Sequence, residues 1–231
     1  MIGRPLYQAL VRGYTEKQWG RHPRSLPPDI IARLPVRFDN RSGYFSDRRQ
    51  GIPLEGYGRL FGKMLSHRNI DVCLNTDFFE IRNLVPKTCR IIYTGPVDRY
   101  FDYAYGRLRW RGLRFEREIL SVGDFQGTAV MNYAAKSVPF TRIHEFRHLH
   151  PERAYIPDRT VIAREYPGEC GPGEDPAYPV NTDGDREALA RYLAGQEKFC
   201  RVIFGGRLGT YRYLNMDQTV KGALETYASK I

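Results

Sequence analysis

Residues 204–218, FGGRLGTYRYLNMDQ, have the residue types and order that could bind a flat or phosphorylated ligand. A short apolar run ends at Gly205 and Gly206, Arg207 follows at once, and a helix running to Ala228 is expected beyond it. Glycine lets the backbone approach a ligand closely, and both a helix N-terminus and an arginine favour negative charge. Because most strand–glycine turns only reverse the chain, the pattern predicts either a ligand site or a plain turn.

Two aromatic residues near the N-terminus could serve the same kind of ligand. Tyr14 and Trp19 lie at the end of a segment with helical apolar spacing, which is expected to end near Gly13 or to begin again at Thr15. Their rings either anchor the core or form a wall for a flat base or sugar.

A cation is offered by the proline-rich loop at 20–35, in which a short helix is expected over 29–34. Arg33 lies on that helix. It is either a solvated side chain or a lid cation that closes over phosphates.

The residues that commonly carry metal or nucleophilic chemistry lack the necessary context. His144, His148 and His150 lie where a strand is expected to run into a loop, so they would not share a helical face, and we expect no metal site. There is no G-x-S-x-G, and no acid–base pair stands out. The cysteines, none in a C-x-x-C pair and all expected to be reduced, are Cys73, Cys89, Cys170 and Cys200. Abundant arginines and aromatics without a protein nucleophile are typical of an enzyme whose cofactor makes the bonds.

The charge of the chain indicates which classes of binding partner are expected. The chain has 231 residues and a formal net charge of +10, so an anionic partner is expected. Its 36 basic residues are scattered, which favours a small anion and argues against nucleic acid; a nucleic-acid binder would show a steep salt dependence. No apolar run reaches the roughly 20 residues of a membrane span, and no signal peptide is evident, so we expect a cytoplasmic protein.

The elements that must position these residues are a mixture of helices and strands. An antiparallel sheet is predicted from strands at 113–119, 128–133 and 160–166, and a continuous apolar strand at 89–94 is expected to be buried on both faces. The amphipathic segment 185–199 is predicted to be a helix with Leu189, Tyr192 and Leu193 inward. The remaining expected elements are a turn-rich hairpin at 36–50, a helix at 53–65, and short strands at 71–75, 78–82 and 202–204.

Several blocks of this chain resemble UDP-galactopyranose mutases, in that family's order and over nearly the whole length. The blocks are GYTEKQWG (13–20), RLPVRF (33–38), YFSDRRQGIP (44–53), IIYTGPVDRYFDY (91–103), DFQGTAVMNY (124–133), PFTRIHEFRH (139–148), YPVNT (178–182) and GGRLGTYRYLNM (205–216). The resemblance implies a flavoenzyme that interconverts UDP-galactopyranose and UDP-galactofuranose for galactofuranose-containing cell-surface glycans. Reduced FAD would act through attack of its N5 on the anomeric carbon.

The resemblance also implies roles for individual residues. The diphosphate would be clamped by the catalytic pair Arg33 and Arg142. The substrate-binding residues would be Tyr14, Thr15 and Trp19 on the uridine side, with Tyr44, Asn132, Tyr178 and Tyr213 lining the diphosphate and sugar. The residues facing the flavin would be Arg207, Leu214, Asn215, Met216, Asp217 and Gln218.

Three departures from the family pattern bear on activity. The family begins with a strand, a G-x-G-x-x-G turn and a helix that hold FAD, and this chain has none of them. Asn215 stands where the family has an acidic residue, and Phe140 where it has a tyrosine; 39–43 also differs from the family's loop. We therefore expect a fragment that is inactive alone, with a homodimer or a complementing N-terminal segment as its partner. The alternative is a non-catalytic UDP-sugar-binding module.

The fold class expected from these observations is α+β: an antiparallel-sheet substrate domain with flanking helices, plus the late-chain strands and helices of an incomplete FAD-binding α/β domain. The predicted divisions are 1–35 for the end of a helical domain with a mobile loop, 36–98 for FAD-domain strands and a helix, 99–182 for the antiparallel sheet, and 183–231 for a helix, the GGRL turn and the C-terminal helix. In such a fragment the strand at 89–94 is expected to expose an apolar edge.

Overall fold

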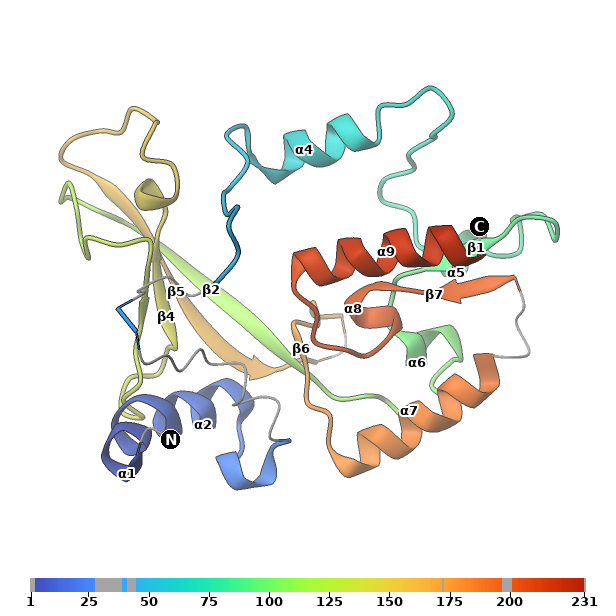
Figure 1. Cartoon of the computed structure of the whole chain (residues 1–231), viewed down its shortest axis with the longest axis horizontal. Helices are drawn as coiled ribbons and strands as arrows, with labels where there is room; N and C mark the ends of the chain where they lie inside the picture. Colours follow the sequence, from blue (N-terminus) through green and yellow to red (C-terminus); the bar gives the residue numbers. More distant parts are fainter. Residues whose placement is uncertain (1–2, 28–38, 41–44, 172, 197–200, 231) are drawn as a thin grey trace.

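The computed structural model describes residues 3–27, 39–40, 45–171, 173–196 and 201–230. Within them the fold is mixed α and β, as expected. A five-stranded sheet has the order β3-β4-β5-β2-β6, and a two-stranded sheet pairs β1 with β7. Figure 1 shows β2 and β5 as the long strands of the larger sheet, which extend toward the second group of helices and strands. The two groups meet where β2 begins.

The larger sheet is antiparallel because its strands alternate and return through short connections. β2 (Trp110–Leu120) pairs with β5 (Thr160–Glu169) in a continuous register from Arg111↔Glu169 to Leu120↔Thr160. β4 (Arg142–Glu145) lies between β5 and β3 (Val130–Asn132). β6 (Tyr178–Pro179) pairs with the first residues of β2. The three strands predicted for this sheet are confirmed, although β3 is shorter than expected.

The N-terminal segment is one continuous helix, so the expected break near Gly13 is wrong. It consists of α1 (Gly3–Leu6), a π-helical stretch (Tyr7–Arg12) and α2 (Gly13–Trp19), and it ends at Gly20, whose φ is 64°. Gly13 has helical dihedrals, and a Cβ there would lie 2.4 Å from Ala134 O. The glycine therefore permits close packing of the helix against the connection between β3 and β4.

Lys17 of α2 fixes that same connection. Its ammonium donates hydrogen bonds to the carbonyl oxygens of Tyr133 (2.6 Å), Val138 (3.0 Å) and Phe140 (2.8 Å). Burial lowers the pKa of Lys17 from its ordinary value. One side chain thus satisfies three loop carbonyls and joins the helix to the strand pair that carries Asn132 and, beyond the loop, Arg142.

The second group is built around the parallel pair β1 (Ile91–Tyr93) and β7 (Val202–Phe204). Its helices are α6 (Val97–Tyr100), α7 (Asp183–Gln196), α8 (Gly206–Gly209) and α9 (Met216–Lys230). The buried cluster that joins it to the start of β2 contains Val97, Leu108, Trp110, Tyr192 and Tyr211. Helix α7 contributes Tyr192 to this core, but Leu193 is 45% exposed, so its predicted inward position is wrong. The next residue along a helix is rotated by about 100° from its neighbour and leaves the buried stripe.

Several other expectations for residues 36–94 are also wrong. Residues 71–75 form no strand, and Phe78–Ile81 is a helix, α5, because Asp77 caps it by accepting a hydrogen bond from Phe79 N (3.0 Å). β1 is not buried on both faces, since Ile92 is 54% exposed. The predicted helix at 53–65 is present as α4 (Gly56–Met64). Of the predicted hairpin only 39–40 and 45–50 are described, and they contain no strand; the short helix expected at 29–34 lies outside the described residues.

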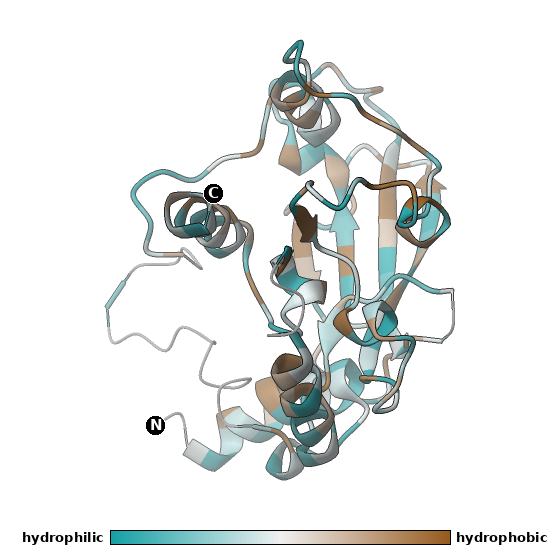
Figure 2. Ribbon diagram, turned by 90° about the vertical axis from the view of Figure 1, so that its right-hand side faces the viewer, coloured by the Kyte–Doolittle hydropathy of each residue, from teal (hydrophilic) through white to brown (hydrophobic). Residues whose placement is uncertain are grey.

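No helix in the part of the chain that the structure describes is long and apolar enough to cross a membrane. Figure 2 shows hydrophobic and hydrophilic residues mixed along the helices.

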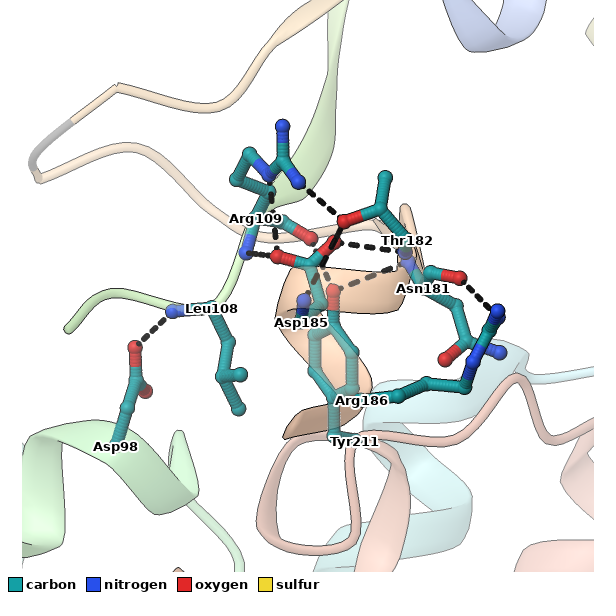
Figure 3. Close-up of polar contacts among 8 residues, drawn as sticks. All are labelled: Asp98, Leu108, Arg109, Asn181, Thr182, Asp185, Arg186 and Tyr211. Carbon is teal, nitrogen blue, oxygen red and sulfur yellow. Dashed lines mark hydrogen bonds and ion pairs between the residues drawn. The ribbon is translucent and has the colours of Figure 1, made fainter. Parts of the chain in front are cut away.

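Buried acidic side chains tie the two groups together at the start of β2 (Figure 3). Asp185 of α7 accepts hydrogen bonds from Arg109 Nε (3.1 Å) and from the Thr182 amide (2.8 Å) and hydroxyl (2.6 Å). Asp98 of α6 accepts from Leu108 N (2.9 Å). Burial alone would raise the pKa of Asp185, but the hydrogen bonds from Thr182 and Arg109 outweigh it and lower the pKa.

Replacing Asp185 with asparagine is expected to lower the free energy of unfolding at neutral pH by about 1–3 kcal/mol, because the amide cannot accept all of these hydrogen bonds. A carboxyl whose pKa is lower in the folded state stabilises the fold above its unfolded pKa of about 3.9 and loses that effect as the pH falls through the folded value. Denaturation between neutral and acidic pH should therefore show a shallower acid dependence for D185N than for the wild type. Asp183→Asn is the control, because that side chain is 89% exposed on the same helix. Equal acid dependence in wild type and D185N would contradict the assignment.

Candidate functional site

Three aromatic rings from separate segments form one wall. Tyr178 of β6 and Tyr213, between α8 and α9, are stacked with ring centroids 5.2 Å apart and an interplanar angle of 6°. Trp19, at the end of α2, lies 6.0 Å from Tyr178 in a tilted arrangement. Aromatic faces of this kind suit a planar base or a sugar ring.

Arg207 contacts both rings of the stacked pair and binds the backbone beside each of them. Its guanidinium donates to Ala177 O (2.7 Å) and to Leu214 O (2.6 Å), and it lies 4.6 Å from the Tyr213 ring centroid and 5.7 Å from that of Tyr178. The residue next to each tyrosine is therefore bound to the same cation. Arg207 therefore positions the two rings of the wall, and its positive charge also favours an anionic ligand.

A second cation, Arg142, lies at the start of β4. Its Nη1 donates to Glu165 Oε1 (3.1 Å), its Nε donates to Asn132 Oδ1 (3.3 Å), and its guanidinium lies 5.7 Å from the Tyr14 ring centroid. Burial alone would lower the pKa of Arg142, but the nearby carboxylate of Glu165 raises it, so the guanidinium stays charged. The side chain is 30% exposed. It is a fixed, charged, partly accessible donor.

The Tyr14 hydroxyl is buried beside the Arg142 guanidinium, and none of the described residues makes a hydrogen bond of good geometry to it. Burial raises the pKa of Tyr14 to about 12, so the hydroxyl stays protonated. A buried hydroxyl without a partner is uncommon because it loses its hydrogen bonds to water. A polar ligand group placed next to Arg142 would satisfy it.

Glu165 was not identified from the sequence. It is 2% exposed in β5 and accepts hydrogen bonds from Arg142, from Thr141 Oγ1 (3.2 Å) and at 3.1 Å from His144 Nε2. Burial alone would raise the pKa of Glu165, but His144 and Arg142 lower it overall. No local sequence pattern distinguishes a buried glutamate that pairs with an arginine from an exposed glutamate in an alternating strand. Its β5 position pairs with the β4 position of Arg142, and this register is visible only in the structure.

Changing Glu165 to glutamine is expected to reduce the free energy of unfolding by about 2–3 kcal/mol, because it leaves the partly buried Arg142 and His144 without their carboxylate. Urea denaturation of the variant should show a lower midpoint with an unchanged slope. Glu116→Gln, an exposed carboxylate beside Arg114 on the neighbouring strand, should leave the midpoint unchanged. If the two variants behaved alike, Glu165 would not be the buried counter-charge.

The three histidines have partners within the chain. His144 contacts Glu165, and His150 Nδ1 lies 2.8 Å from Glu152. His148 Nε2 lies 3.2 Å from Asp124 and 3.5 Å from Glu145, and these three offer ligand atoms within 4.8 Å of one another. The oxygens of Glu145 also accept from the amides of residues 125 and 126 and from the hydroxyl of residue 160, so this carboxylate organises the loop before β3.

The other predicted site residues have mixed positions. Thr15 is buried, 6% exposed, and Trp19 is 7% exposed, although Trp19 borders a surface cavity of about 780 Å³. Asn215 lies just before α9, where its amide donates to Gln218 Oε1 (2.8 Å), and the side chains of residues 216–218 are exposed. The two predicted residues that lie outside the described residues are Arg33 and Tyr44.

A sequence model of the UDP-galactopyranose mutase family matches residues 9–213. The chain belongs to this family. It is 41% identical over 225 residues to a Klebsiella pneumoniae protein named "Probable UDP-galactopyranose mutase", a match that covers 97% of this chain and 57% of that protein. It is 34% identical to an Escherichia coli protein named "dTDP-fucopyranose mutase", over 97% of this chain and 60% of that one.

The fold is also that of a mutase. A crystal structure of reduced UDP-galactopyranose mutase superposes with a TM-score of 0.58 at 12% identity, covering 99% of this chain and 65% of the other. A UDP-galactopyranose mutase of Mycoplasma pneumoniae is 30% identical, over 91% of this chain and 56% of that protein. The chain thus spans a little over half the length of the mutases it matches in sequence.

Proposed function

We propose that this chain carries the nucleotide-sugar half of a UDP-galactopyranose mutase. The main support is an aromatic wall next to a fixed cation, assembled from elements far apart in sequence. The elements are α2, β4, β6 and the α8–α9 connection. They bring together Tyr14, Trp19, Arg142, Tyr178 and Tyr213. A uridine ring suits the wall, and the diphosphate suits Arg142.

Arg142 would stabilise the UDP leaving group as the bond to the sugar breaks. UDP gains negative charge as its bond to the anomeric carbon of galactose lengthens, so a cation fixed beside the diphosphate stabilises the transition state more than the ground state. Glu165 and Asn132 hold the guanidinium in place before substrate arrives. Arg33 is proposed as the second clamp.

The residues present fit the ring end of a flavin. Gly205 has no heavy atom within 4 Å of the place where a Cβ would lie, so a flat ring can approach the backbone there. Arg207 and residues 214–218 would hold it. A reduced FAD supplies a nucleophilic N5 when bound. No G-x-G-x-x-G turn is present in the sequence to hold the dinucleotide end.

The half of the fold around β1 is proposed to need a complementing segment. β1 pairs with β7 alone among the described strands, and Ile92 of β1 is 54% exposed. Figure 1 shows α4 apart from the other elements. The large hydrophobics exposed on α4 and α9 are Tyr57, Leu60, Phe61, Met64, Met216, Val220, Leu224 and Tyr227. Unpaired edges and exposed apolar residues of this kind favour association. The rest of a mutase would cover them, and a second copy of the chain is the other candidate partner.

The test is an assay of UDP-galactofuranose conversion with FAD under dithionite, for the chain alone and for the chain co-expressed with the part of the Klebsiella pneumoniae mutase that it does not match. We expect turnover only in the second case. UDP binding without turnover in either would favour the alternative, a non-catalytic UDP-sugar-binding module. Turnover by the chain alone would contradict the need for a complementing segment. Parallel titrations with UDP and dTDP would show which nucleotide the chain prefers, because one relative is named "dTDP-fucopyranose mutase".

A further inference from the structure

Tyr211 lies two residues before Tyr213 of the stacked pair, and its side chain is buried. It is 3% exposed, and its ring packs edge-on against Trp110 with centroids 5.0 Å apart. Its hydroxyl donates a hydrogen bond to Arg109 O (2.6 Å) and accepts one from Asn181 N (3.2 Å), as Figure 3 shows. Burial raises the pKa of Tyr211, so the hydroxyl remains protonated and able to donate.

The two residues joined by the Asn181–Tyr211 hydrogen bond both have a positive φ. Tyr211 has a φ of 49° and Asn181 a φ of 57°. Asparagine is enriched in the left-handed region, but a tyrosine there is uncommon and is maintained only when the surrounding structure holds it. The carbonyl of Asn181 is held as well, since it accepts from Arg186 Nη1 (2.8 Å).

Two of the three aromatic residues of the wall are close in sequence to these two positions of positive φ. Tyr213 follows Tyr211 by two residues, and Tyr178 precedes Asn181 by three. The segments 177–181 and 211–214 are therefore joined twice. Arg207 joins them by donating to Ala177 O and Leu214 O, and the Tyr211 hydroxyl joins them by accepting from Asn181 N. In sequence, Tyr178 and Tyr213 each lie between the two linked positions of their segment.

We infer that Tyr211 is a positioning residue of the nucleotide-sugar site, which acts through Asn181 N and Arg109 O to keep Tyr178 and Tyr213 stacked. This inference rests on the proposed function for its effect on UDP, but its effect on the two rings does not depend on any ligand. Tyr211 itself does not touch the proposed substrate.

The chain offers a matched control. Tyr211→Phe deletes the hydroxyl and keeps the ring against Trp110. Tyr192→Phe makes the same change in a tyrosine with no exposed surface, whose hydroxyl accepts from Tyr105 N (3.0 Å) and donates to Gly106 O (2.7 Å). Each variant loses one accepted and one donated hydrogen bond to backbone, so both should lower the melting temperature to a similar extent.

The aromatic NMR signals of Tyr178 and Tyr213 are the direct readout in the full chain. We expect them to shift in Tyr211→Phe and to stay in place in Tyr192→Phe. In the same pair the dissociation constant for UDP should rise about tenfold only in Tyr211→Phe. Ring signals that stay in place in Tyr211→Phe, or shift equally in both variants, would overturn the inference.

Failure of the proposed function would look different. If the wild type did not bind UDP, the assignment of the nucleotide-sugar site would be lost, while the ring signals would still decide whether Tyr211 positions the pair. If Tyr211→Phe did not fold, Tyr211→His, which keeps a planar ring with polar nitrogens, would replace it in the same comparison. A larger shift of the Tyr178 and Tyr213 signals in Tyr211→His than in Tyr192→His would support the inference, and an equal or smaller shift would overturn it.

Discussion

Replacement of Arg142 with lysine is expected to raise the dissociation constant for UDP by about 10- to 100-fold, the equivalent of losing one charge-assisted hydrogen bond of about 1.5–3 kcal/mol. Lysine keeps the charge opposite Glu165 but cannot reproduce the planar guanidinium, which donates to Glu165 and Asn132 at once. Titration of UDP followed by tryptophan fluorescence measures the effect, because Trp19 lies in the proposed wall.

Lysine is a better test than alanine at this position. Alanine would leave the buried carboxylate of Glu165 without its cation, and the fold itself could suffer. Arg117→Lys, on an exposed position of β2, is the matched control and should leave UDP affinity unchanged. An Arg142→Lys variant that binds UDP as tightly as the wild type would remove this arginine from the diphosphate site.

The largest loss of stability is expected for Lys17→Met, at about 3–4 kcal/mol in the free energy of unfolding. The substitution keeps an aliphatic side chain and removes the ammonium that three carbonyls of the 133–140 loop share as a donor, so each of them loses a charge-assisted hydrogen bond. Partial access of water reduces the full sum of three such losses. Thermal or urea denaturation would measure it, and hydrogen exchange of residues 133–140 should rise in parallel.

Lys136 provides the comparison for Lys17, since it lies in the same loop and contacts the same helix. Its ammonium is 3.1 Å from Glu16, and its side chain is 77% exposed. Lys136→Met removes the same charge, and stability should be unaffected because exposed ion pairs contribute little. If Lys17→Met were as stable as Lys136→Met, the loop would have to be held by other contacts.

The parts of the fold that sequence reasoning found are those with a strong local pattern. Alternation at 113–119 marks a strand with two different faces, and the apolar run at 202–204 marks β7. Errors occurred where a single contact overrides local preference. Asp77 caps α5 where a strand was expected, and Gly13 continues a helix because Ala134 packs against it.

For the site, residue types and spacing led to the GGR turn and the N-terminal aromatics, while Arg142, Tyr178 and Tyr213 came from resemblance to the mutase family. Glu165, Lys17 and Tyr211 were missed. Their importance depends on partners 23, 116 and 102 residues away in sequence, and no local pattern records such pairings. Buried polar side chains of this kind are therefore the information that the structure adds.

The central claim is that this chain holds a preassembled nucleotide-sugar site. A calorimetric titration of the full chain with UDP, in the absence of flavin, tests this claim most directly. Galactose serves as the ligand control. We predict saturable binding of UDP at one site per chain, no measurable heat from galactose, and weaker UDP binding by Arg142→Lys. A folded chain that shows no UDP binding at millimolar concentration would contradict the claim, because the wall and the cation would then not form the site assigned to them.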